Sequence, residues 1–236
     1  MERWALASGL KGDLEIYEQI QRDLKRQRGV ETFFVLGDLI GPGQNCGDLL
    51  NRLRNPLRGD LIPQCIYGWW EDQLLAETGF RGDRKAEALR LNQGEDVVEA
   101  LLKAVDSSHR QWLASLQFGF IELDCGLIHG SSADVSDELT PESSPLILLD
   151  RLTRLDVNRL FTARCGKQFR LELTGGEIDS HVKDLEGQHD QQQVVPKRTI
   201  IGIGAGTAYT LYDPGSDHIS FLTAGSTSVS KRLGFG

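Results

Sequence analysis

Three short apolar runs in the first third of the chain, each followed by a glycine-containing loop, constrain the fold more than any other feature. The runs cover residues 4–7, 32–36 and 63–67. Between them lie two segments with apolar residues at helical spacing, one starting at the N-capping Asp13 and one over residues 46–54. This alternation predicts right-handed βαβ units and a parallel sheet, so we expect an α/β protein.

The rest of the chain continues the same alternation without an internal repeat or a clear linker. Helical spacing covers residues 84–116 and 146–155, a hairpin is expected over 118–129, and the polar residues 131–145 indicate a loop. The final third is strand-like at residues 159–163, 168–173, 199–203, 208–212 and 218–222. Residues 181–197, with three consecutive glutamines among charged residues, are expected to form an exposed loop. We therefore expect one domain over residues 1–236.

Charge and cysteine usage exclude several classes of function. The 236 residues include 26 Lys and Arg against 34 Asp and Glu, a net charge of −8, which disfavours nucleic acid as a partner. No apolar run approaches the roughly 20 residues that span a bilayer, so no membrane insertion is expected. The four cysteines are widely scattered, which favours reduced thiols in a cytoplasmic protein.

Chemistry in an α/β protein is expected in the loops that follow the carboxyl ends of parallel strands. Here those loops are residues 8–13, 37–43, 68–72, 129–131 and 162–166. One of the five histidines, His129, stands in the fourth loop. The remaining four lie in polar or turn contexts and are expected on the surface: His109, His181, His189 and His218. The five loops are therefore where a site is to be sought.

The five loops, in order, resemble the motif blocks of the calcineurin-like metallophosphoesterases, especially the compact bacterial and archaeal type. Residues 36–43, LGDLIGPG, resemble the block G-D-x-V-G-x-G-P, and residues 127–131, LIHGS, resemble V-H-G-S. Residues 8–14, 67–71 and 161–165 stand where that family has S-D-x-H-G-N-L, G-N-H-D and G-H-T-H. The resemblance implies a four-layer α/β/β/α sandwich with two mixed β-sheets.

The resemblance implies a site for two metal ions that activate water against a phosphoryl group, but most of its ligands are missing. Only Asp38 and His129 keep a ligand-capable identity. The other positions are occupied by Gly9, Lys11, Trp69, Ala163 and Cys165, while Trp70 replaces the proton-donating histidine. We therefore expect no catalytic residue, no metal and no cofactor. Rebuilt Mn or Zn ligation is the alternative; its candidate ligands are Asp13, Asn45, Cys46, Glu71, Asp72 and Cys165.

Two of the substitutions bring positive charge to the loops. Lys11 and Arg164 stand at or beside positions where metal ions would have been, and a buried Asp38 needs a positive partner. One interpretation is a remnant ion pair with Asp38. The other is an anion-binding pocket in which Lys11 and Arg164 receive phosphate or carboxylate.

Trp69 and Trp70 introduce two indoles where polar residues are expected. One interpretation is that the rings fill the volume that metal ions and water would have taken. The other is a binding surface for a partner, because tryptophan dominates interface energetics. The first hypothesis for the whole chain is a catalytically inactive scaffold or regulatory module that binds another protein. The alternatives are a metal-dependent phosphoesterase with rebuilt ligands and a metal-free anion sensor.

Overall fold

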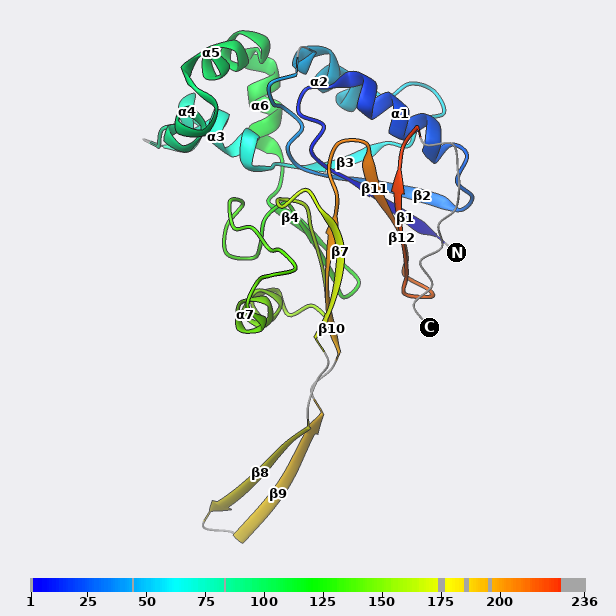
Figure 1. The fold of residues 1–236 in the computed structure, drawn as a ribbon, viewed down its shortest axis with the longest axis vertical. Helices are drawn as coiled ribbons and strands as arrows, with labels where there is room; N and C mark the ends of the chain where they lie inside the picture. Colours follow the sequence, from blue (N-terminus) through cyan, green and yellow to red (C-terminus); the bar gives the residue numbers. More distant parts are fainter. Residues whose placement is uncertain are drawn as a thin grey trace.

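Two five-stranded mixed sheets pack face to face in the computed structural model, which describes residues 2–43, 45–82, 84–173, 177–184, 187–194 and 197–225 (Figure 1). The first sheet has the order β12-β11-β1-β2-β3, in which β1, β2 and β3 are parallel and β11 and β12 antiparallel. Its strands are β1 (Arg3–Ala7), β2 (Val30–Leu36), β3 (Pro63–Ile66), β11 (Ala208–Asp213) and β12 (His218–Thr223).

The second sheet has the order β4-β5-β6-β10-β7, with β5, β6 and β10 parallel to one another and the two edge strands antiparallel to their neighbours. Its strands are β4 (Gly119–Glu122), β5 (Cys125–Ile128), β6 (Arg159–Thr162), β7 (Gln168–Leu173) and β10 (Arg198–Ile203). Apolar side chains from both sheets, among them Phe34 and Phe161, form the buried layer between them. Each fully buried side chain of this size contributes roughly 1.5–3 kcal/mol.

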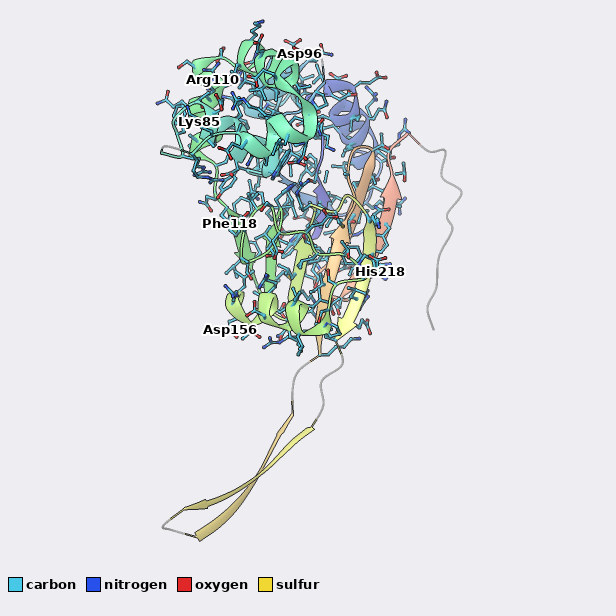
Figure 2. All side chains as sticks on the ribbon, turned by 60° about the vertical axis from the view of Figure 1, so that its left-hand side comes forward. Lys85, Asp96, Arg110, Phe118, Asp156 and His218 are labelled. Atoms are coloured by element: carbon cyan, nitrogen blue, oxygen red, sulfur yellow. The ribbon has the colours of Figure 1, made fainter. Side chains whose placement is uncertain are left out.

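Helices cover the outer faces of both sheets. The helices that share one buried core with the first sheet are α1 (Leu14–Leu24), α2 (Cys46–Arg54), α3 (Trp69–Glu77), α4 (Glu87–Gln93), α5 (Glu95–Ala104) and α6 (Ser107–Ser115). Helix α7 (Pro145–Leu155) packs on the second sheet through Leu148 and Leu152. Figure 2 shows Asp96 and Arg110 on the helices at one end of the body and Asp156, just after α7, at the other. This is the α/β/β/α arrangement that the resemblance implies.

Helix α3 was not predicted from its sequence, in which the residues after the third strand indicated only a loop. Residues 69–76 are all buried, so the helix has no solvent face and no apolar stripe with a period of 3.6. Its first turn carries Trp69, Trp70 and Glu71 into the site described below.

The expectation of a loop over residues 181–197 was wrong. Residues 177–194 contain an antiparallel ladder of β8 (Glu177–Asp184) and β9 (Gly187–Val194), whose register runs from Glu177↔Val194 to Asp184↔Gly187. It forms its own two-stranded sheet, drawn beyond the ends of β7 and β10 in Figure 1. Backbone hydrogen bonds hold such a ladder together, so a polar sequence does not prevent it. Residues 185–186 and 195–196 of the expected loop lie outside the described residues.

One histidine expected at the surface is buried. His109 is 5% exposed, and its Nε2 lies 3.0 Å from Asn51 Oδ1 on α2. The amphipathic pattern of α6 is weak, and a histidine paired with an amide is satisfied without water. His218 is exposed as expected, whereas the side chains of His181 and His189 lie outside the described part of the structure.

All four cysteines have free thiols. Over the described ranges, the helices are too short and too polar for any of them to cross a bilayer.

Candidate functional site

The five candidate loops meet at one edge of the sandwich. Strands β1, β2 and β3 are parallel, so the loops at Ser8, Gly37 and Gly68 share the carboxyl edge of the first sheet. His129 follows β5 and Ala163 follows β6 at the corresponding edge of the second sheet. His129 Nδ1 lies 2.7 Å from the Leu36 carbonyl oxygen, which joins the two edges.

Asp38 and His129, the two retained ligand types, contact each other. Asp38 Oδ1 lies 3.2 Å from His129 Nε2 and accepts a hydrogen bond of 3.1 Å from the Trp70 N–H. Asp38 is 4% exposed and His129 is 1% exposed. Burial lowers the pKa of His129; the nearby Arg164 and Lys11 act in the same direction, against the opposing effects of Asp38 and the Leu36 carbonyl. A neutral imidazole whose Nδ1 donates to Leu36 presents the Nε2 lone pair to Asp38.

Glu71 anchors the backbone of these loops. Its Oε2 accepts from the N–H groups of Asp38 (2.9 Å) and Gly68 (2.6 Å), and its Oε1 accepts from Ile40 (2.8 Å). The residue is fully buried. Burial and the neighbouring Asp38 carboxylate raise the pKa of Glu71 to about 8, although the three N–H groups favour the ionised form. The carboxylate is occupied by backbone donors, so it is not free as a substitute ligand.

Gly9 and Lys11 occupy a backbone turn that is fixed by the Asp38 loop. Gly9 has φ +66° and Lys11 has φ +48°, and the N–H of Lys11 donates to the Asp38 carbonyl at 2.9 Å. A Cβ added at Gly9 would lie 2.7 Å from the Cβ of Ala205. The left-handed conformation and this contact both disfavour a carboxylate residue at position 9. The Lys11 side chain is exposed.

Trp69 and Trp70 are 5% and 4% exposed, and their rings make an edge-to-face contact with centroids 5.6 Å apart. Both belong to the core between the first sheet and its helices. The Arg164 guanidinium lies over the Trp69 ring, 4.8 Å from its centroid. Filling of space explains this burial, and it leaves the two indoles little surface for a partner.

The last loop contributes no ligand pair. Ala163 is buried, and the Ala163 and Arg164 N–H groups donate to the His129 carbonyl at 2.9 and 2.8 Å. Cys165 is half-buried with its Sγ 4.0 Å from the Lys167 carbonyl, and burial raises its thiol pKa. Its thiol therefore stays protonated at neutral pH, which is the form that binds metals poorly.

Three of the other neighbours considered as substitute ligands, Asp13, Asp72 and Cys46, make structural contacts. Asp13 caps α1 through the N–H groups of Glu15 and Ile16, and Asp72 pairs with Arg81 and Arg84. Cys46 Sγ is directed at the Gly41 carbonyl at 3.3 Å, and burial raises its pKa. Asn45 stands at the start of α2 without a capping hydrogen bond from its side chain.

The residues present do not fit a two-metal centre. In the described part of the chain, no three His, Cys, Asp or Glu side chains are grouped so that they could hold an ion. Asp38 and His129 supply two donors, whereas protein zinc sites use three or four. The ion pair expected between Asp38 and either cation is also not found: among described residues, neither Lys11 nor Arg164 lies within 4 Å of a carboxylate. Their role as an anion pocket stays a prediction.

Sequence reasoning missed the organising role of Glu71, which it considered only as a ligand. It also missed Ser8, whose buried Oγ lies 2.8 Å from the Leu36 carbonyl and 3.0 Å from the Gly37 carbonyl. The signal was available in part, because a glutamate three residues after Gly68 at a helix start is the capping-box spacing.

Comparisons with known proteins identify the architecture. The sequence matches no protein-family model and no curated protein. The structure is similar to a metallophosphoesterase from Sphaerobacter thermophilus, with a TM-score of 0.63, 17% identity, and coverage of 94% of this chain and 88% of that one. It is also similar to a cold-active protein-tyrosine phosphatase of the psychrophile Shewanella sp., with a TM-score of 0.52, 12% identity, and coverage of 94% and 81%. At identities this low a likeness shows the fold alone, and the chain has the metallophosphoesterase fold.

Proposed function

We propose that this chain is a non-catalytic protein of the metallophosphoesterase fold that acts by binding another protein. The observation that carries the proposal is the set of side chains at the strand ends. Gly9, Trp69 and Ala163 offer no metal-ligating atom where the fold's enzymes are expected to have one, and Trp69 fills its position with a buried ring. Two-metal activation of water has no donor set here.

Binding without turnover needs the fold intact, and the hydrogen bonds of Glu71, Ser8 and His129 keep these loops in place. Exposed apolar side chains on α7 support a protein partner. Leu146 is 78% exposed and Ile147 is 45% exposed, although both belong to the helix that covers the second sheet. Neighbouring exposed apolar residues of this kind are common at protein interfaces.

The catalytic half of the proposal is tested by metal content and turnover. Untagged protein is assayed by metal mass spectrometry and with p-nitrophenyl phosphate and its bis ester in the presence of Mn²⁺. We expect no stoichiometric metal and no turnover that depends on Asp38. Stoichiometric metal with turnover that disappears in Asp38→Asn would show an enzyme with rebuilt ligation and end the proposal.

The binding half is tested on α7. Leu146→Asp is compared with Leu91→Asp, a matched change at a leucine of α4 that is 86% exposed. Quantitative affinity purification from the native host should show proteins retained by the wild type and Leu91→Asp and lost from Leu146→Asp. If the same proteins are retained by all three, α7 is not the binding surface.

A further inference from the structure

Positive charge is concentrated on one surface of an otherwise acidic chain. Residues 22–28 and 52–60 contain seven of its 26 Lys and Arg but only two of its 34 Asp and Glu. The first segment is the last turn of α1 with the residues after it, and the second is the end of α2 with the loop that leads to β3. Helices α1 and α2 lie next to each other (Figure 1). We call these two segments, together with residues 61–62, the basic patch.

Hydrogen bonds and an ion pair fix the second segment against α1. The Lys25 ammonium lies 2.9 Å from Asp60 Oδ1. Gln21 Nε2 donates to the Leu61 carbonyl at 2.8 Å, and Gln21 Oε1 accepts from the Leu61 N–H at 3.2 Å. A turn precedes this contact, because the Asp60 N–H donates to the Leu57 carbonyl at 3.0 Å and Asp60 Oδ2 accepts from the Leu57 N–H at 3.2 Å. The surface is therefore formed before a ligand arrives, which lowers the entropy cost of binding.

The two carboxylates within the basic patch are already occupied. Asp60 lies between Lys25 and Arg52, and its side chain is only 2% exposed. Asp23 accepts a hydrogen bond from the Tyr209 hydroxyl of β11. One buried carboxylate shared by two cations leaves an excess of positive charge at the surface. At physiological salt, charges more than about 8 Å away are largely screened, so this local excess decides what binds here although the whole chain is acidic.

Exposed guanidinium groups and exposed apolar side chains occur together in the basic patch. Arg26 and Arg58 are exposed, and among the described residues neither has a carboxylate within 4 Å. Leu57 is 61% exposed and Ile62 is 75% exposed. A guanidinium binds a carboxylate through two parallel hydrogen bonds, and neighbouring exposed apolar side chains gain free energy when a partner covers them. The patch thus combines the two features that an acidic and partly apolar ligand requires.

We infer that the basic patch binds an acidic segment of a partner protein, and that this segment also carries apolar side chains. Its carboxylates pair with Arg26 and Arg58, and its apolar side chains cover Leu57 and Ile62. The end of this chain does not supply the segment, because residues 226–236 contain two cations and no acidic residue. The inference rests on the proposed function, in which the chain binds another protein, and it gives that partner a charge and a surface distinct from α7.

Nucleic acids and anionic membranes are also attracted by arginine, but they fit the basic patch less well. Single-stranded nucleic acid gains much of its affinity by stacking bases on aromatic rings. Tyr17, whose ring lies 5.6 Å from the Arg52 guanidinium, is fully buried and offers no such platform. An anionic bilayer faces a whole side of the molecule, so the net charge of −8 opposes its approach. A protein segment contacts the patch alone.

The experiment uses the full chain and a fluorescently labelled peptide of Glu-Glu-Leu repeats, with binding followed by fluorescence anisotropy. We expect binding that weakens as the salt concentration rises. The double variant Arg26→Glu, Arg58→Glu should weaken it at least about tenfold, because two attractions become repulsions. The matched double variant Lys85→Glu, Lys103→Glu makes the same change in net charge at exposed cations elsewhere, and it should leave the affinity unchanged.

The apolar part of the inference is tested with a second peptide and a second pair of variants. A peptide of Glu-Glu-Gln repeats, with the same charge and no leucine, should bind the wild type at least about threefold more weakly. Ile62→Ser should weaken binding of the leucine peptide by a similar factor, whereas Leu91→Ser, at an exposed leucine of α4, should not. The comparison of the two peptides needs no variant, so the inference stays testable if a variant does not fold.

Several outcomes overturn the inference. Absence of binding to the leucine peptide ends it, and equal losses in the two double variants reduce the binding to net charge. Equal affinity for the two peptides removes the apolar contact. Single-stranded DNA or phosphatidylserine vesicles that bind as tightly as the leucine peptide, and lose that binding in Arg26→Glu, Arg58→Glu, would assign the patch to nucleic acid or to a membrane. Each of these results leaves the proposed function standing, because metal content, turnover and the partners of α7 are measured separately.

Discussion

The loop edge of this fold contains two sets of positions, which differ in whether their side chains hydrogen-bond to the backbone of neighbouring loops. The loop frame consists of Ser8, Asp38, Glu71 and His129, which are at most 4% exposed and contact backbone groups of neighbouring loops. The ligand positions are those at which the resemblance implies a metal ligand but this chain has another residue. They are Gly9, Lys11, Trp69, Ala163 and Cys165.

The two sets are expected to differ in how much the free energy of folding depends on them. Each residue of the loop frame satisfies a buried backbone donor or acceptor, so losing it costs folding free energy whether or not a metal binds. Cys165, at a ligand position, makes no such short hydrogen bond, so a change of its side chain is expected to cost little folding free energy. The loop frame can thus be retained while the ligand positions change. Four predictions test whether the stability of the protein depends on the frame and not on the ligand positions.

The largest effect is expected for Glu71→Ala. It leaves the N–H groups of Asp38, Ile40 and Gly68 without their acceptor in the core. We expect a loss of roughly 3–5 kcal/mol in the free energy of unfolding, measured by urea denaturation. Glu71→Gln keeps one acceptor oxygen and should lose less. An alanine variant as stable as the wild type would show that the frame does not depend on this carboxylate.

Gly37→Ala should follow in size. Gly37 has φ +75°, and an added Cβ would lie 2.4 Å from the Gly68 Cα, so both conformation and contact oppose it. Gly79→Ala is the matched control, because Gly79 has φ +81° with nothing within 4 Å of an added Cβ. The control should cost about 1–2 kcal/mol and Gly37→Ala at least about 1 kcal/mol more by thermal unfolding. Equal losses would mean that the loops do not pack as closely as described.

Glu77→Gln tests the far end of α3, the helix that brings Glu71 into the frame. Glu77 bonds Arg90 Nη2 at 2.8 Å and accepts from the Ala86 N–H, and these contacts lower the pKa of Glu77 to about 2. The folded protein keeps this carboxylate ionised below the pH at which the unfolded chain protonates it. Its stabilisation is therefore full above about pH 4.5 and is lost as the pH falls towards 2.

The wild type should accordingly be more stable than Glu77→Gln at pH 7, by a few degrees in Tm, and the gap should narrow steadily as the pH falls from about 4.5 towards 2. Calorimetry across this range checks it. A gap that does not change with pH would assign the difference to packing rather than to the ion pair.

The smallest effect is expected at a ligand position. Cys165 is half-buried, and its Sγ lies 4.0 Å from the Lys167 carbonyl oxygen. Cys165→Ser should change the free energy of unfolding by less than about 0.5 kcal/mol and should not alter metal content. A larger loss of stability would show that Cys165 contributes to folding as the loop frame does. A change in bound metal would show that Cys165 is a metal ligand.

Much of the fold could be predicted because its signals are local. The bounds of α2 follow from the leucine spacing over residues 46–54, and Asp13 predicts the start of α1. The β4–β5 hairpin and five later strands also lie where their apolar runs are. Helix α3 and the β8–β9 ladder could not be found in this way, because one is buried on all sides and the other has a polar sequence.

The candidate site was predictable as a list of positions but not as a set of contacts. Its loops share an edge because the strands before them are parallel, and strand order along the chain indicates this. The partner of Asp38 was not indicated: an ion pair with Lys11 or Arg164 was expected, and His129 is the group in contact. The burial of Trp69 and Trp70 likewise depends on helices far along the chain.

By itself, the sequence determined the α/β class and the edge at which a site would lie, because these depend on periodicity and strand order. It also gave the residue types that stand where the resemblance implies metal ligands. Only the tertiary structure decided what the remaining polar groups do. Glu71 accepts from the backbone, Asp38 contacts His129, and among the described residues neither Lys11 nor Arg164 has a carboxylate within 4 Å. Hydrogen bonding and burial are set by distances between segments that are remote in the chain, and no local pattern encodes those distances.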